Sequence, residues 1–266
     1  MLNSPLEQFN IISILRLTTP ASPIGRKPYP IIPIHISNLY FSFTNSSLFF
    51  LLATLLICLL YHMVTINGGV LVPTRWQSVV EMFYEFVVNM VEEQIGEKGR
   101  KYFTLIFTTF MFILSLNLIG LIPYSFASTS HLIVTFGMSL SLFLGITIIG
   151  LQIHGLHFFS FFLPAGAPLA LAPALVVIEL VSYVFRPISL GVRLGANIMA
   201  GHALLVILSG FAWTMLTAGG FLAVAAIFPF AIVFAITCLE FAVAGLQAYV
   251  FTILLTIYLR DAIELH

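Results

Sequence analysis

Charged and amide side chains recur at regular spacings in the apolar second half of this 266-residue chain. Arg193 and Asn197 are four residues apart and would share one face of a helix. Arg186 precedes Arg193 by seven residues and Glu179 precedes it by fourteen, so all four lie on roughly one stripe. A charge inside a membrane costs a few kcal/mol, so such residues must be paired, face water or take part in transport.

A second group of polar residues follows nearer the C-terminus. Glu240 and Gln247 are seven residues apart and share a helix face, and Asp261 lies fourteen residues beyond Gln247. An antiparallel pairing that sets Arg193 beside Gln247 brings Glu179 and Asp261 to one level, about 21 Å to one side.

The same pairing brings His202 and Glu240 to nearly one level, about 10–14 Å to the other side of Arg193. A histidine and a carboxylate are groups that suit a proton relay. The arrangement therefore predicts two aqueous routes that connect only past Arg193.

Other interpretations of these residues remain open. Arg193 could form a buried structural ion pair with Glu179 or Glu240. Arg186 is expected to be a helix-end or lipid-headgroup contact. Small residues surround Arg193 and would let another helix approach closely, which suits ordinary packing as well as function. These small residues are Gly191, Gly195, Ala196, Ala200 and Gly201.

Composition places these residues in a membrane protein. Hydrophobic residues make up 60% of the chain and charged residues 8%, and the mean hydropathy is +1.10. A water-soluble domain carries about 25% charged residues. Ten basic and ten acidic residues leave no electrostatic footprint for nucleic acid. The composition therefore excludes a soluble enzyme, a disordered chain and a nucleic-acid binder, and the short alternating segments of a β-barrel are absent.

Apolar runs and their breaks predict an all-α integral membrane protein. The two cysteines, Cys58 and Cys238, match neither a disulfide framework nor a metal motif and are expected to be small buried hydrophobes. The expected elements are a tail (1–47), a first spanning helix (48–66), an amphipathic surface helix (75–98), a helical hairpin (103–122 and 131–152), a loop (153–168) and two long helical runs (169–217 and 221–260).

The two long runs exceed the thickness of a membrane. Each would be on the order of 60 Å long, whereas the hydrocarbon core of a bilayer is about 30 Å thick. Each run must therefore break into two upright spans, or tilt steeply against a special partner. The segment 75–98 carries Glu81, Glu85 and Glu92 on one stripe, which indicates a helix in the membrane interface or one packed on protein.

Several motifs resemble subunit a of F-type ATP synthases. The most specific is SLGVRLGANIMAGH (Ser189–His202), and supporting matches run through most of the chain. They are NSPLEQF, LVPTRWQS, EEQIG, NLIGLIPYSFASTSH, HGLHFFSFFLPAGAP and YLRDAIELH.

The resemblance implies one upright helix, a surface helix, a hairpin and two long tilted helices packed against the ring of c subunits. It also implies peripheral-stalk subunit b and other membrane-sector subunits as partners, protons as the transported ion, and no cofactor or metal. The expected location is the mitochondrial inner membrane, with the N-terminus in the intermembrane space and the C-terminus in the matrix.

Residue roles follow from the same resemblance. Arg193 corresponds to the essential arginine that faces the c-ring, and Asn197 and Gln247 to polar residues near it. His202 and Glu240 correspond to the intermembrane-space half-channel.

Glu179 and Asp261 correspond to the matrix half-channel. No phosphate-binding loop is present, so ATP chemistry is expected in another subunit.

Two other classes of membrane protein also place polar side chains inside the membrane. A channel or secondary transporter would usually show internal repeats, and no convincing repeat is seen. A b-type haem protein needs paired axial histidines on facing helices, yet no predicted span holds two histidines.

Overall fold

The computed structural model describes residues 33–36, 39–42, 45–66, 72–122, 125–155, 157–158 and 172–264. Most of the predicted tail and most of the predicted loop at 153–168 therefore lie outside the described residues. Inside the predicted tail, β1 (Pro33–Ile36) pairs antiparallel with β2 (Leu39–Ser42), with Pro33 opposite Ser42. This small hairpin is an addition to the all-helical expectation.

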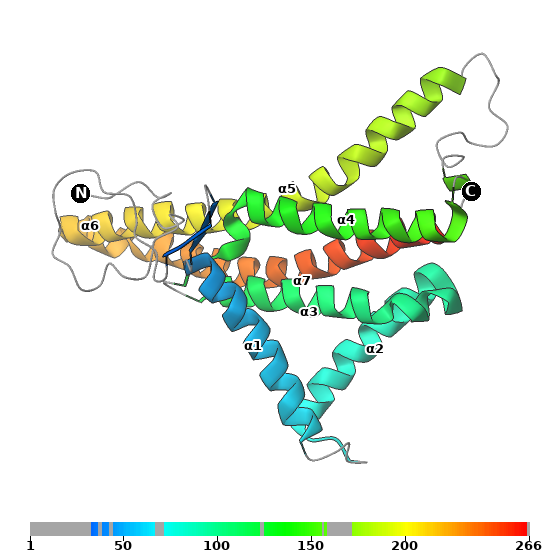
Figure 1. Cartoon of the computed structure of the whole chain (residues 1–266). Helices are drawn as coiled ribbons and strands as arrows, with labels where there is room; N and C mark the ends of the chain where they lie inside the picture. Colours follow the sequence, from blue (N-terminus) through cyan, green and yellow to red (C-terminus); the bar gives the residue numbers. More distant parts are fainter. Residues whose placement is uncertain are drawn as a thin grey trace.

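Long apolar helices dominate the described part of the chain (Figure 1). Five helical segments there are long and apolar enough to cross a membrane, so the prediction of an all-α integral membrane protein is confirmed. The helices are α1 (Asn45–Thr65), α2 (Arg75–Ile95), η3 (Gly96–Tyr102), α3 (Phe103–Gly120), η4 (Ser128–Ser130), α4 (Leu132–His154), α5 (Ala172–Ala218), α6 (Gly220–Ala225) and α7 (Ile227–Ile263).

The last predicted run, 221–260, is divided in the structure. A turn at Ala226 separates α6 from α7. Pro229 lies in the first turn of α7, where its missing N–H costs no helical hydrogen bond. Gly219 and Gly220 have φ angles of +73° and +60°, a conformation that favours glycine, and they let the chain reverse after α5.

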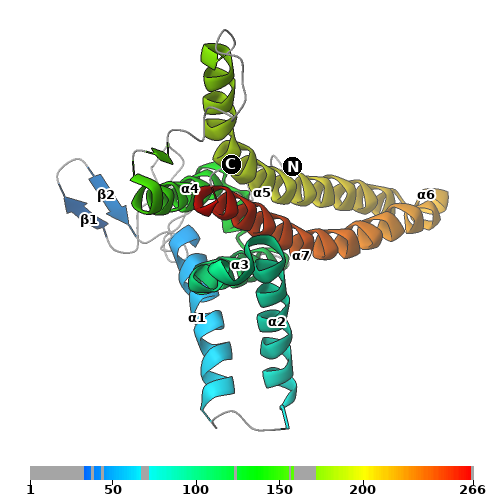
Figure 2. The same cartoon turned by 90° about the vertical axis from the view of Figure 1, so that its right-hand side faces the viewer.

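A four-helix layer forms the body of the molecule. The helices α3, α4, α5 and α7 pack on one another, whereas α1 and α2 project from one side of this layer (Figure 2). The core between the helices is apolar and includes Ile106, Leu190, Leu194, Phe251 and Leu255.

The amphipathic pattern of α2 is used for packing on protein. Val87, Met90 and Val91 are buried in the main core, while Glu81 and Glu85 are exposed. The helix contacts α1, α3 and α7, so part of its apolar face packs on protein.

The helix α5 is bent, as Figure 1 shows in its yellow-green part. Pro187 lies inside α5, where it lacks an N–H and its ring crowds the preceding turn. The Ser139 hydroxyl of α4 donates a 2.8 Å hydrogen bond to the Pro187 carbonyl. Gly191 and Gly195 follow on the face of α5 that meets α4, where added Cβ atoms would lie 2.6 Å from Ser139 Oγ and 2.8 Å from Thr135 Oγ1. These contacts determine which face of α5 turns away from α4.

Candidate functional site

An amide pair fixes the antiparallel alignment of α5 and α7. Asn197 Nδ2 donates a 3.0 Å hydrogen bond to Gln247 Oε1, and Gln247 is only 2% exposed. The predicted alignment sets Arg193 directly beside Gln247. In the structure the residue bonded to Gln247 is instead Asn197, one helical turn further along α5.

Arg193 lies on an exposed face of α5. Within the described residues it makes no hydrogen bond or ion pair, so the buried pair with Glu179 or Glu240 is not formed there. The same face continues through large exposed apolar side chains, namely Leu204, Ile207 and Phe211, which are 47%, 57% and 57% exposed.

Arg186 joins two of the predicted site carboxylates. Its guanidinium donates to Glu179 Oε1 at 3.2 Å and to Asp261 Oδ2 at 3.1 Å, and its side chain is 19% exposed. The sequence-based expectation for Arg186 is a helix-end or lipid-headgroup contact, and the structure adds two carboxylate partners, one of them in the last turn of α7. The α7 helix brings Asp261 to the same level as Glu179, so Arg186 forms an ion pair with each of them. We call Glu179, Arg186 and Asp261 the ion triad.

Two aromatic rings flank the ion triad. The Arg186 guanidinium carbon lies 5.7 Å from the centroid of the Tyr183 ring and 5.5 Å from that of Tyr258, which are cation–π distances. The hydroxyls of Tyr183 and Thr147 lie 2.7 Å apart, so α4 also holds this group. The arginine is thus fixed between three helices.

On the other side of Arg193, Glu240 packs against the backbone of α5. A Cβ atom added to Gly201 would lie within 3.0 Å of the Glu240 carboxyl carbon. Both carboxyl oxygens of Glu240 are buried and have no hydrogen-bond partner among the described residues. His202, the next residue of α5, hydrogen-bonds to the backbone of Gly120 at the end of α3. The structure therefore brings His202 and Glu240 to one region, as the sequence pattern predicts.

One further residue of this region is absent from the sequence-based candidates. Asn117 of α3 is 1% exposed, and its Nδ2 donates a 3.2 Å hydrogen bond to the Ala244 carbonyl of α7. Its sequence signal is an amide in the largely apolar end of α3, LSLNLIG. We call Asn117, Asn197, His202, Glu240 and Gln247 the buried polar cluster, in which Asn117 and Gln247 are buried, His202 and Glu240 half-buried, and Asn197 exposed at the edge.

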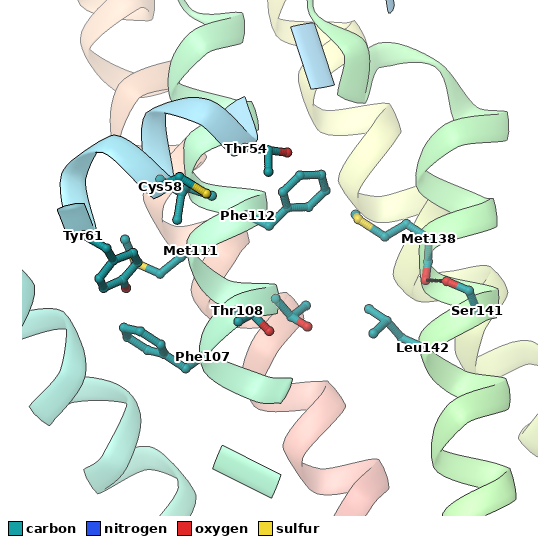
Figure 3. A pocket seen from close by; sticks show the side chains of 12 residues that line it. Thr54, Cys58, Tyr61, Phe107, Thr108, Met111, Phe112, Met138, Ser141 and Leu142 are labelled. Carbon is teal, nitrogen blue, oxygen red and sulfur yellow. Dashed lines mark hydrogen bonds between the residues drawn. The ribbon is translucent and has the colours of Figure 1, made fainter. Parts of the chain in front are cut away.

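A separate apolar cavity of about 570 Å³ opens between α1, α3 and α4 (Figure 3). Its lining includes Thr54, Cys58, Tyr61 and Phe107, and no residue of the ion triad or the buried polar cluster reaches it. Cys58 and Cys238 are free thiols and exposed, so the expectation that both are buried is wrong. In the described part of the chain, no three His, Cys, Asp or Glu side chains lie close enough to hold a metal ion.

Comparison with known proteins decides the family. The family model described as ATP synthase A chain matches residues 47–260, which include every residue of the ion triad and the buried polar cluster except Asp261. The chain belongs to the ATP synthase subunit a family. It is 61% identical to ATP synthase subunit a of Marchantia polymorpha over 266 residues, covering 99% of both chains.

Other relatives agree with this assignment. ATP synthase subunit a-2 of Arabidopsis thaliana is 56% identical, with 99% of this chain and 72% of the relative covered. ATP synthase subunit a of Chondrus crispus is 47% identical, with 100% and 98% covered. The predicted family is thus confirmed, and a subunit a is the non-catalytic, proton-translocating component of the membrane sector. Family membership sets aside the transporter and haem-protein alternatives.

Proposed function

We propose that the chain couples proton flow to rotation of a c-ring, with Arg193 as the fixed charge that faces the ring. The observation that carries this proposal is the exposure of Arg193 without an ion pair in the described part of its own chain. An exposed arginine at membrane depth is too costly to face lipid, so the proposal places a protein carboxylate against it. A passing c subunit, deprotonated at its carboxyl group, supplies that charge.

The apolar surface beside Arg193 supports the same proposal. Leu204, Ile207 and Phe211 extend the exposed stripe along α5 for about 27 Å beyond Arg193, at 1.5 Å per residue. A steeply tilted helix of this length needs a partner that covers it, and a ring of hydrophobic helices meets that need. The remaining proposed partners are peripheral-stalk subunit b and other membrane-sector subunits.

Two polar regions flank Arg193 along α5, and we assign one half-channel to each. The ion triad begins at Arg186, about 10 Å before Arg193, and His202 lies about 13 Å after it. Glu179 and Asp261 would conduct protons on the matrix side. His202, Glu240, Asn197 and Gln247 would do so on the intermembrane-space side.

Arg193 would separate the two half-channels and prevent a direct proton leak between them. The proposed location is the mitochondrial inner membrane, with the N-terminus in the intermembrane space. Five segments able to span a membrane fit termini on opposite sides.

Proton-driven ATP synthesis in native membranes tests the proposal. Arg193→Gln is expected to abolish synthesis while the complex remains assembled, because the fixed charge is lost without a change of fold. Hydrolysis by the detached soluble sector should stay intact. The matched control is Arg260→Gln, which removes the charge of an α7 arginine whose side chain is 46% exposed.

The outcomes separate the alternatives. Lost synthesis with an assembled complex supports Arg193 as part of the transport mechanism, provided that Arg260→Gln retains synthesis. Lost assembly in Arg193→Gln alone would favour a structural ion pair with another subunit. Near-normal synthesis would contradict the proposed role of Arg193.

A further inference from the structure

The buried polar cluster has a gap between two of its members. Glu240 and Gln247 are seven residues apart on α7, about 10 Å along the helix, which is too far for a direct hydrogen bond. Ala244 lies between them, and its carbonyl accepts the hydrogen bond from Asn117. Asn117 therefore enters from α3 at the level where α7 has no polar side chain of its own.

Around this level, several buried polar atoms of the cluster have no hydrogen-bond partner among the described residues. Asn117 Oδ1 is a buried acceptor with no partner among the described residues, and Gln247 Nε2 is a buried donor in the same situation. Both carboxyl oxygens of Glu240 share this property. Buried polar groups are nearly always hydrogen-bonded, and where protein partners are missing an internal water takes their place.

Other contacts place the end of α3 against both long helices. Asn117 bonds to α7 at Ala244, and three residues later Gly120 bonds to His202 of α5. Positions three residues apart share a helix face, so one face of α3 forms the third wall of the buried polar cluster. Asn117 is 1% exposed, so its amide is buried between α3 and the two long helices.

We infer that Asn117 is a further positioning residue of the proton route, whose Oδ1 holds the water that connects Glu240 to Gln247. The Nδ2 bond to Ala244 keeps the amide in place and leaves Oδ1 as the acceptor for that water. Asn197, bonded to Gln247, continues the route toward Arg193. The inference rests on the proposed function and adds to it a residue from α3.

Variants of Asn117 in the intact complex test this role through proton-driven ATP synthesis and ATP-driven proton pumping. Asn117→Leu removes the acceptor at similar volume and is expected to lower both rates about tenfold in the assembled complex. Asn117→Asp keeps an acceptor oxygen on a side chain of the same size, and its protonated form can still donate to the Ala244 carbonyl, so it should restore most of the rate. The matched control is Thr109→Val, because Thr109 is also buried in α3 but bonds only to Leu105 of its own helix.

The results have distinct meanings. Normal transport in assembled Asn117→Leu, or equal losses in Asn117→Leu and Thr109→Val, would overturn the inference. So would equal losses in Asn117→Leu and Asn117→Asp, since the retained acceptor oxygen would then make no difference to transport. Arg193→Gln, run in parallel, separates the two proposals: if it stops transport while Asn117→Leu does not, only the role of Asn117 fails.

A second measurement does not depend on assembly of a variant. A high-resolution density map of the unmodified complex should show an ordered water within hydrogen-bond distance of Asn117 Oδ1. A dry contact between Asn117 and its neighbours would overturn the inference even if Asn117→Leu fails to assemble.

Discussion

Asn197 of α5 donates its side-chain hydrogen bond to Gln247 of α7 at 3.0 Å, one helical turn beyond Arg193. The pair joins α5 and α7, and each of the two residues lies near the middle of its own helix. Gln247 is buried and Asn197 is on the exposed face. The bond therefore connects the interior of the protein to the surface on which Arg193 lies. It also holds Gln247, a buried member of the buried polar cluster, next to that surface.

The ion triad should depend on Arg186. Arg186→Leu leaves Glu179 and Asp261 without their shared cation, and because these carboxylates are about one-third exposed we expect a loss of about 1–3 kcal/mol in stability. The thermal stability of the extracted complex measures this loss. Asp261→Asn added to Arg186→Leu should recover part of it, because one uncompensated charge is removed.

The control for this prediction is Arg260→Leu. Arg260 is 46% exposed and lies 3.9 Å from Glu264, so its loss should cost about 0–1 kcal/mol. Equal losses of stability in Arg186→Leu and Arg260→Leu would show that the ion triad stabilises the protein no more than an exposed ion pair does.

Glycine at position 201 should be required for the placement of Glu240. In Gly201→Ala the new Cβ meets the Glu240 carboxyl group, so the carboxyl group or the helix must shift. We expect proton pumping by the assembled complex to fall about tenfold. Gly245→Ala in α7 is the matched control, since a Cβ there meets nothing within 4 Å. Unchanged pumping in Gly201→Ala would mean that Glu240 can move without consequence.

The close contact of α4 and α5 should not tolerate a side chain at Gly191. Its added Cβ would lie 2.6 Å from Ser139 Oγ and 2.8 Å from Phe136 Cα, and the backbone atom cannot rotate away. Gly191→Ala is expected to destabilise the extracted complex by about 1–3 kcal/mol, measured by thermal unfolding. Ser139→Ala should not rescue it, because the contact with Phe136 remains. Gly145→Ala in α4, which meets nothing within 4 Å, should be close to neutral.

The two half-channels should respond to opposite faces of the membrane. Glu240→Gln and Glu179→Gln each remove a titratable group, so each should slow proton transport. Varying the pH on one face at a time in sealed vesicles checks the assignment. Glu240→Gln should change the response to the intermembrane-space pH, and Glu179→Gln the response to the matrix pH. Identical responses on both faces would rule out two separate routes.

Much of the fold could be predicted from the sequence because the membrane restricts the choices. Runs of apolar residues longer than a bilayer must be helices, since backbone groups in lipid have to bond within their own segment. The position of Arg193 in such a run, together with the SLGVRLGANIMAGH motif, indicated both the family and the residue at the centre of the proposed mechanism. The common level of Glu179 and Asp261 follows from spacing once an antiparallel pairing of Arg193 with Gln247 is assumed.

Other features depend on contacts that spacing does not contain. The role of Arg186 required α7 to bring Asp261 within 3.1 Å, and the position of Asn117 required α3 to meet α7 at Ala244. The Gly191 face of α5 packs on α4, and Arg193, two residues further along, is exposed. The sequence by itself determined which residues carry charge inside the membrane, because burial of charge is costly wherever it occurs. Only the tertiary structure decided which of these charges are paired and which one faces outward, because pairing depends on the rotation and alignment of helices that are far apart in the chain.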